Sequence, residues 1–279
     1  MPEDIPSPSQ PGKENANRRA TDVPAALRYR TIWISDIHLG TRGCQAERLL
    51  DFLKNTKSDF LYLVGDIVDG WQLKKRWYWP QSHNDVIQKI LHRVRDGTQV
   101  FYVPGNHDEA ARNFCALSFG GVQVIDDIVH TTATGQRLLI LHGDQFDSFL
   151  FHAKWIGKLG STAYISLLNV NGILNFIRRK MGFSYWSLSA YLKHKVKNAV
   201  AYIGAFESLV ADEARRQQVD GVVCGHIHQI DMRMIGPVLY CNDGDWVESC
   251  TALVEDKDGK LSIIDWTKER EGLLRQAAA

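Results

Sequence analysis

The chain has 279 residues, of which 44% are hydrophobic, enough for one large buried core. Its 33 basic and 32 acidic residues nearly cancel, so overall charge does not direct the protein to a nucleic acid. The five cysteines are odd in number and contain no CxxC pair, which argues against a disulfide framework or a thiolate zinc site. A reducing, cytoplasmic location is therefore expected.

Residues 1–28 are rich in Pro, Ser, Gln, Lys and Glu and lack the apolar run of a signal peptide. This composition predicts a disordered N-terminal tail. Residues 29–279 are predicted to form one catalytic domain.

From residue 29 onward, strand patterns alternate with helical patterns. Helices are predicted at 45–56 and 82–96, and strands at 29–35, 60–64, 99–103, 138–141 and 219–224. The chain is expected to end in hairpins, with a turn at 256–259. Mixed strands with helices on the outer faces predict a layered α/β sandwich, in which ligands collect at the carboxyl ends of strands.

A polar motif follows each predicted strand. In chain order these are Asp36-Ile37-His38, Gly65-Asp66, Gly105-Asn106-His107-Asp108, His142-Gly143-Asp144 and Gly225-His226-Ile227-His228. Carboxylate, amide and imidazole donors without sulfur suit Mn²⁺, Fe or Zn²⁺. The glycines beside these donors permit tight turns and close approach of the backbone to a metal.

Taken together, the motifs D-x-H, G-D-x-x-D, G-N-H-D, H-G and G-H-x-H resemble the calcineurin-like metallophosphoesterase superfamily over about residues 30–245. The resemblance implies an αββα sandwich of mixed sheets with two divalent metal ions, Mn²⁺ first and Fe or Zn²⁺ as alternatives. It implies that one ion is held by Asp36, His38, Asp66 and His228, and the other by Asp66, Asn106, His142 and His226.

Two such ions, about 3.5 to 4 Å apart, activate a shared water and clamp phosphate oxygens. His107 follows ligand Asn106, and both are predicted to contact the substrate. We expect His107 to protonate the departing oxygen, with Asp108 orienting its ring. Asp69 and Asp144 are predicted as hydrogen-bond partners behind the ligands. Residues 242–245 resemble the closing loop of the superfamily, although a plain turn explains them as well.

Residues 146–206 are predicted to form a helical lid. No acidic residue lies between Asp147 and Glu207, whereas eight basic residues do. This segregation indicates an anionic partner, either a polyphosphate substrate or an anionic membrane surface, unless the helix is simply solvated. The basic residues predicted to bind substrate are Arg178, Arg179, Lys193, Lys195 and Lys197.

Residues 159–177 carry no charge and are long enough to raise the question of a membrane span. His142 and His226 flank this stretch and are expected to share an ion, so a single crossing would separate them. An interfacial lid, with the protein peripheral on the inner membrane, fits better.

A helical, aromatic and basic insert between the H-G and G-H-x-H motifs resembles the UDP-2,3-diacylglucosamine diphosphatases of lipid A synthesis. The resemblance implies hydrolysis of a UDP-linked lipid to UMP and a lipid 1-phosphate, with acyl chains under the lid. The best-known branch has Arg at the position of His107. The alternatives are a phosphodiesterase or phosphatase acting on a cyclic nucleotide or a phospholipid, and a non-catalytic metal-binding scaffold.

Overall fold

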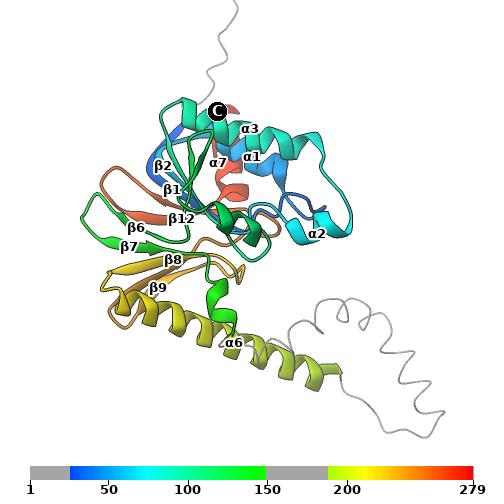
Figure 1. Ribbon diagram of the computed structural model, residues 1–279, viewed down its shortest axis with the longest axis vertical. Helices are drawn as coiled ribbons and strands as arrows, with labels where there is room; N and C mark the ends of the chain where they lie inside the picture. The colour runs from blue at the N-terminus through cyan, green and yellow to red at the C-terminus, as the bar shows by residue number, and fades with distance from the viewer. Residues whose placement is uncertain (1–25, 149–187, 279) are drawn as a thin grey trace, which may run out of the picture.

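The computed structural model describes residues 26–148 and 188–278. Within these ranges two β-sheets pack face to face, and helices cover their outer faces (Figure 1). The predicted layered αββα sandwich is confirmed.

The first sheet is seven-stranded, in the order β12-β11-β1-β2-β3-β5-β4. Parallel pairing joins β1, β2, β3 and β5, while β11, β12 and β4 pair antiparallel with their neighbours. The strands span Leu27–Ile34 (β1), Thr56–Val64 (β2), Gln99–Val103 (β3), Ser118–Phe119 (β4), Val122–Val124 (β5), Thr251–Glu255 (β11) and Leu261–Asp265 (β12).

The second sheet is five-stranded, in the order β6-β7-β8-β10-β9, with β7, β8 and β10 parallel. Its strands are Ile128–Thr131 (β6), Arg137–Ile140 (β7), Gly221–Cys224 (β8), Asp231–Ile235 (β9) and Val238–Asn242 (β10). The carboxyl ends of the parallel strands in both sheets carry the motifs that the sequence singled out.

Helices follow from the spacing of apolar side chains. In α1 (Ala46–Asn55), for example, Ala46, Leu49, Phe52 and Leu53 are buried at the three- and four-residue spacing of one helical face. The remaining helices are α2 (Gly70–Lys75), α3 (Gln81–Arg95), α6 (Leu188–Arg216) and α7 (Trp266–Ala278), with 3-10 helices η1 (Glu109–Phe114) and η2 (Asp144–Ser148).

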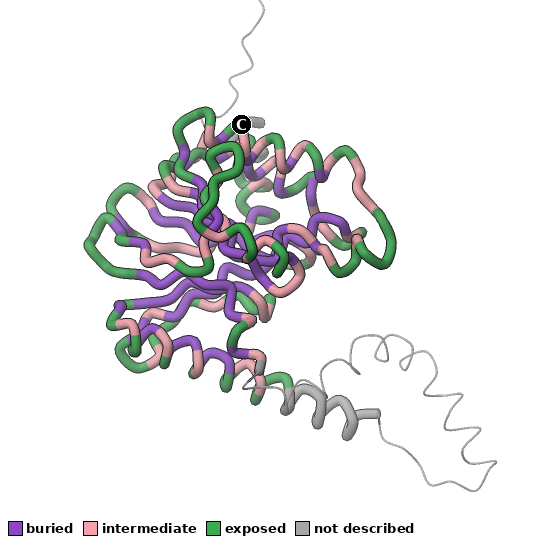
Figure 2. The backbone as a smooth tube through the Cα atoms, viewed as in Figure 1, coloured by how far each residue is buried: buried purple, intermediate pink, exposed green. Residues whose placement is uncertain are grey.

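Three apolar layers hold the sandwich together, and Figure 2 shows buried backbone concentrated in the strands. Trp33, Tyr62 and Leu138 lie in the layer between the sheets. A second layer, including Phe52, packs between the first sheet and its helices. A third layer, including Phe206, packs α6 on the second sheet.

Several boundaries differ from the sequence prediction: for example, β2 begins at Thr56 and not at residue 60, and the two ends of the described domain also differ. Leu27 and Arg28, predicted as tail, already pair with Thr56 and Lys57 of β2. The chain does not end in hairpins, because the β11–β12 hairpin, with its predicted turn at 256–259, is followed by α7. Trp266, the first residue of this last helix, is buried and packs against Phe52, which attaches the start of the helix to the core.

Most of the predicted tail and most of the predicted lid lie outside the described residues. α6 includes the last part of the lid range and continues to Arg216. Among the helices of the described ranges, none combines the length and apolar character required to span a membrane.

Candidate metal centre

The predicted ligands meet where the carboxyl ends of parallel strands from both sheets come together. Asp36 and His38 follow β1, Asp66 follows β2, and Asn106 follows β3. Backbone hydrogen bonds tie the loops together: Asp36 N donates to Gly65 O at 3.0 Å and His38 N to Asp66 O at 2.9 Å. From the second sheet, β7 and β8 contribute the remaining histidines, His142, His226 and His228.

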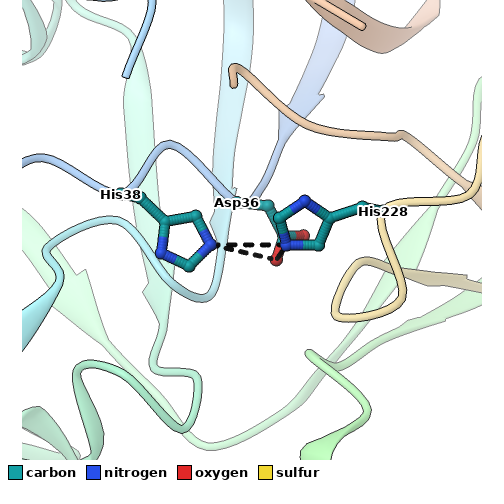
Figure 3. Close-up of side chains that lie close together, drawn as sticks. All are labelled: Asp36, His38 and His228. Carbon is teal, nitrogen blue, oxygen red and sulfur yellow. Dashed lines mark hydrogen bonds and ion pairs between the residues drawn. The ribbon is translucent and has the colours of Figure 1, made fainter. Parts of the chain in front are cut away.

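One group of donors consists of Asp36, His38 and His228 (Figure 3). Asp36 Oδ1 lies 3.1 Å from His228 Nε2 and 3.8 Å from His38 Nε2. The two imidazole Nε2 atoms are 3.4 Å apart. Three donor atoms that converge in this way could hold one divalent ion.

Asp66 lies between this group and the next. Its Oδ2 is 3.8 Å from His38 Nε2, while its Oδ1 is 3.5 Å from His142 Nε2. Asp36, Asp66 and His142 converge as a further group of potential ligands. The carboxylate of Asp66 thus contacts donors of both groups, and its role as a bridging ligand stays a prediction.

The residues present fit a pair of metal ions. Asp36 Oδ1, Asn106 Oδ1 and His142 Nε2 are buried without a hydrogen-bond partner in the described part of the chain. Buried polar atoms without partners are costly, and folded proteins rarely keep them without a reason. Cations would satisfy all three, and oxygen and nitrogen donors without sulfur suit transition metals.

Two glycines make room for this packing. A Cβ on Gly65 would collide with the ring of His142, and Gly65 also has a positive φ of 80°. A Cβ on Gly105 would lie 2.7 Å from His142 Nε2 and would collide with the Asp66 carboxylate. These glycines therefore let the backbone pack closely on the donor side chains, while close approach to a metal stays a prediction.

Several donor residues have left-handed backbone conformations. Asp36, His38, Asp66, His226 and His228 have φ between 49° and 71°. Residues other than glycine seldom adopt this region, and such strain concentrates at functional sites.

The carboxylates create a strongly negative potential. Although burial opposes ionisation, contacts with His228 and His142 lower the pKa of Asp36. Burial likewise opposes charging of His142, but Asp66 and Asp36 outweigh it and raise the pKa of His142 to about 10. The potential that attracts a proton here also attracts a metal cation.

His226 is arranged differently from the other predicted ligands. Its backbone N donates to Asp36 Oδ2 at 2.9 Å, and its ring lies 5.2 Å from that of His142. Its Nε2, however, is 2.9 Å from Asp147 Oδ1. The structure thus brings His226 to the edge of the cluster, and its role as a ligand stays a prediction.

His107 lies beside the cluster, with Nε2 3.9 Å from Asp66 Oδ2. Asp69, and not the predicted Asp108, lies against its ring, with Oδ2 3.0 Å from His107 Nδ1. The same oxygen is 3.3 Å from His38 Nδ1. Burial opposes charging of His107, but Asp69 and Asp66 outweigh it and raise its pKa.

The Asp108 carboxylate turns away from His107 because backbone amides hold it. It accepts hydrogen bonds from the amides of Gly105 at 2.6 Å and Ile67 at 2.7 Å. Asp108 therefore fixes the loops that carry Asp66 and Asn106, which corrects the orienting role that the sequence suggested.

The structure adds supports that sequence reasoning missed. Ser35 Oγ lies 2.6 Å from both Asp36 Oδ2 and Asp243 Oδ1 and donates its single proton to one of them, so the 242–245 loop closes on the site. Arg112 binds Asp144 at 2.7 Å and donates to Pro104 O at 3.0 Å. A lone arginine outside any motif gives no sequence signal for this link.

The structure does not describe the side chains of the basic residues that are predicted to bind substrate. Arg178 and Arg179 lie outside the described residues, as do the side chains of Lys193, Lys195 and Lys197 on α6.

Comparison with known proteins agrees with this geometry. Residues 29–230, which include every donor motif, match the model of the calcineurin-like phosphoesterase family. The chain belongs to this family, a class of phosphoester hydrolases with divalent metal sites.

The chain is also similar to proteins named UDP-2,3-diacylglucosamine hydrolases. The chain is 33% identical over 118 residues to a UDP-2,3-diacylglucosamine hydrolase of Chromohalobacter salexigens, a match that covers 41% of this chain and 46% of the relative. The chain thus spans about half the length of that relative. A UDP-2,3-diacylglucosamine hydrolase of Vibrio cholerae is 24% identical over 257 residues, covering 84% of this chain and 96% of the relative.

Among solved structures, Vacuolar Protein Sorting 29 of Cryptosporidium parvum superposes with a TM-score of 0.39 and 12% identity, covering 84% of this chain and 94% of the other.

Proposed function

We propose that the protein hydrolyses the pyrophosphate bond of UDP-2,3-diacylglucosamine or a similar UDP-linked lipid, giving UMP and a lipid 1-phosphate. The similarity to the Vibrio cholerae UDP-2,3-diacylglucosamine hydrolase carries the proposal, because it extends over 84% of this chain and 96% of the relative. The cluster of buried ligand atoms that lack hydrogen bonds supports the metal-dependent chemistry.

In this proposal Asp36, His38, Asp66 and His228 hold one ion, and Asp66, Asn106, His142 and His226 hold the other. The ions, Mn²⁺ by preference, supply Lewis-acid activation of water and neutralise phosphate charge. His226 Nε2 lies 2.9 Å from Asp147 Oδ1, so His226 would have to give up this contact to serve as a ligand.

His107 and Asp69 form the acid of the reaction. The charge of Asp69 favours a proton on His107 Nδ1, since Asp69 Oδ2 lies 3.0 Å from this atom. His107 Nε2 lies 3.9 Å from Asp66 Oδ2, beside the residues that would hold the ions. The imidazolium hydrogen-bonds the phosphate and gives its Nε2 proton to the departing oxygen, after which the neutral ring keeps the Nδ1 proton.

The basic insert is proposed to hold the rest of the substrate. Arg178, Arg179, Lys193, Lys195 and Lys197 would face the diphosphate or anionic lipid head groups, with the protein at the cytoplasmic membrane surface. The charge segregation of the sequence supports this part of the proposal.

The runner-up is a metal-dependent phosphodiesterase or phosphatase with another substrate, such as a cyclic nucleotide or a phospholipid. His107 favours it, because the family resemblance associates His at this position with such enzymes and Arg with the best-known diphosphatase branch. The intact donor set opposes a non-catalytic scaffold.

The test is to incubate Mn²⁺-loaded protein with UDP-2,3-diacylglucosamine and to measure UMP by mass spectrometry, with Asp66→Asn as the inactive control. Bis-p-nitrophenyl phosphate, a simple diester, is assayed in parallel. Turnover of the diester without UMP release would support the runner-up. Bound metal with no turnover of either compound would support the scaffold.

A further inference from the structure

β9 is the last strand of the second sheet, and within the described residues β10 is its one neighbour. On β10, Leu239 N donates to the carbonyl of Asp220, which precedes β8, so the backbone groups of Leu239 point away from β9. The antiparallel partner of Leu239 on β9 is Met234. Because such a pair exchanges no hydrogen bonds, Met234 and, two residues earlier, Met232 direct their N–H and C=O groups to the open edge. This edge is therefore able to accept another strand.

The side chains of β9 favour such pairing. Arg233 contacts Glu207 of α6. Since successive side chains of a strand point to opposite faces, Met232 and Met234 lie on the face away from α6. Met232 is 39% exposed and Met234 58%, and Ile230, directly before the strand, is 36% exposed. Edge strands are commonly protected by Lys or Pro, and β9 contains neither.

A second copy of the same strand is complementary to β9. In an antiparallel pair with its twofold axis at Met232, this residue lies opposite its counterpart, and the two exchange backbone hydrogen bonds. The same register places Asp231 opposite Arg233 of the second copy, and the reverse. It also places Ile230 opposite Met234 of the second copy, which joins apolar side chains. A register centred on Arg233 would instead place two arginines opposite each other, so charge selects the register centred on Met232.

We propose that two copies of this chain pair through β9 in this register and join their five-stranded sheets into one continuous sheet. β9 follows His228 closely in the chain, so the pairing would also restrain the loop that carries His226 and His228. A short edge strand buries less surface than a standard interface, and we therefore expect a dimer with a micromolar dissociation constant. The pairing does not depend on which substrate the metal centre hydrolyses.

Sedimentation velocity of the full chain, loaded with Mn²⁺, tests the pairing at concentrations from about 1 to 100 µM. The wild type should change from monomer to dimer as the concentration rises. Met234→Lys adds a charge to the apolar side of the pair. Met232→Pro removes the central backbone donor, which points away from β10 and is not needed for the β9–β10 ladder. Both variants should remain monomeric over this range.

Val200→Lys is the matched control for Met234→Lys. It makes the same change from an apolar side chain to Lys at a position on α6 that is 63% exposed, compared with 58% for Met234. This variant should dimerise as the wild type does.

Charge exchange between the copies tests the register. Asp231→Lys and Arg233→Glu each place like charges opposite one another in a homodimer, so each should weaken dimerisation roughly 10- to 100-fold. An equimolar mixture of the two variants should restore it, because each variant then meets the opposite charge on the other. Recovery in the mixture would also show that both variants are folded. A mixture that stays monomeric, with both variants folded by circular dichroism, would overturn the proposed pairing.

A wild type that is monomeric over the whole range would overturn the proposal. A dimer that persists in Met234→Lys and Met232→Pro would assign the self-association to another surface and overturn it too. Hydrogen exchange identifies any other occupant of the edge. The amides of Met232 and Met234 should be protected only at concentrations where the dimer forms, and protection in the monomer would mean that another part of the chain covers β9.

Discussion

The Glu255 network and the metal centre both contain buried carboxylate and histidine side chains, but they differ in how these side chains are hydrogen-bonded. The Glu255 network consists of Glu255 with the groups that bind it. Arg30 donates to its Oε1 and Oε2 at 2.9 and 2.7 Å, and Ala133 N donates to Oε1 at 2.7 Å. His130 Nε2 lies 3.1 Å from Glu255 Oε2, and its other ring nitrogen, Nδ1, hydrogen-bonds with the hydroxyl of Tyr62.

At the metal centre, by contrast, Asp36 Oδ1, Asn106 Oδ1 and His142 Nε2 have no hydrogen-bond partner among residues 26–148 and 188–278. The backbone differs too, since Asp36 has φ of 49° whereas Glu255 lies in regular β11. Similar residue types therefore serve two purposes. A cluster whose polar atoms are hydrogen-bonded to one another supports the fold, and one that leaves buried polar atoms without hydrogen bonds is prepared for a cation.

Removing a donor from the metal centre should have the largest effect. We expect Asp66→Asn and Asn106→Ala to abolish hydrolysis, because each removes a ligand that the two-ion geometry needs. Metal content by mass spectrometry and kcat on a simple diester are the measurements. A near-native rate in either variant would disprove the assignment of the site.

Removing the metal ions should abolish hydrolysis, as the ligand substitutions do. EDTA is expected to inactivate the protein, and Mn²⁺ should restore more activity than Mg²⁺, since imidazole ligands favour the transition metal. The contrast is the effect of Glu255→Gln on thermal unfolding. This effect should be the same with and without EDTA, because the Glu255 network should not respond to metal. Equal recovery with Mg²⁺ would contradict the stated preference.

Substitution of the residues beside the ions should have an intermediate effect. His107→Ala is expected to keep its metals and lose on the order of 10² to 10⁴ in kcat, the span of a positioned acid. Asp69→Asn should lose about 10 to 100-fold, because Asp69 orients rather than contacts substrate. The pH dependence of kcat separates the two roles. Asp69→Asn should move the alkaline limb of the profile, which reports the pKa of His107, to lower pH. Metal loss in His107→Ala would instead make His107 a ligand.

The sequence revealed the donors because strand ends and glycines leave strong local patterns. Asp36, Asp66 and His142 could be assigned to one site before any contact was known. The partner of His107 could not, because the choice between Asp69 and Asp108 depends on which carboxylate faces backbone amides. The Glu255 network joins β1, β6 and β11 across the chain, and no motif marks it.

Breaking the Glu255 network should affect stability alone. Glu255→Ala leaves Arg30 and His130 without their carboxylate, so we expect a loss of about 3 to 5 kcal/mol in the free energy of unfolding, measured in urea. Below its unfolding temperature the variant should keep its kcat and metals. A large fall in kcat at full occupancy would mean that this network reaches the metal centre.

The smallest effect is a change in the shape of the stability curve with pH. Although burial opposes ionisation, hydrogen bonds from His130, Thr31, Ala133 and Arg30 lower the pKa of Glu255 from 4.5 to about 2. A carboxyl whose folded pKa is depressed contributes stability that is fully present above the unfolded pKa and is lost as pH falls through the folded pKa.

The Glu255→Gln variant lacks this titration. The difference in unfolding free energy between wild type and Glu255→Gln should therefore be constant above pH 4.5. It should shrink by on the order of 3 kcal/mol as pH falls toward 2, the amount that this pKa shift represents. Urea unfolding in EDTA over this pH range is the measurement. The metal-centre carboxylates titrate alike in both proteins, so their contribution cancels in the difference. A gap that stays constant down to the lowest pH would show that the Glu255→Gln variant loses packing rather than charge, and the contrast between the two clusters would then rest on the metal centre alone.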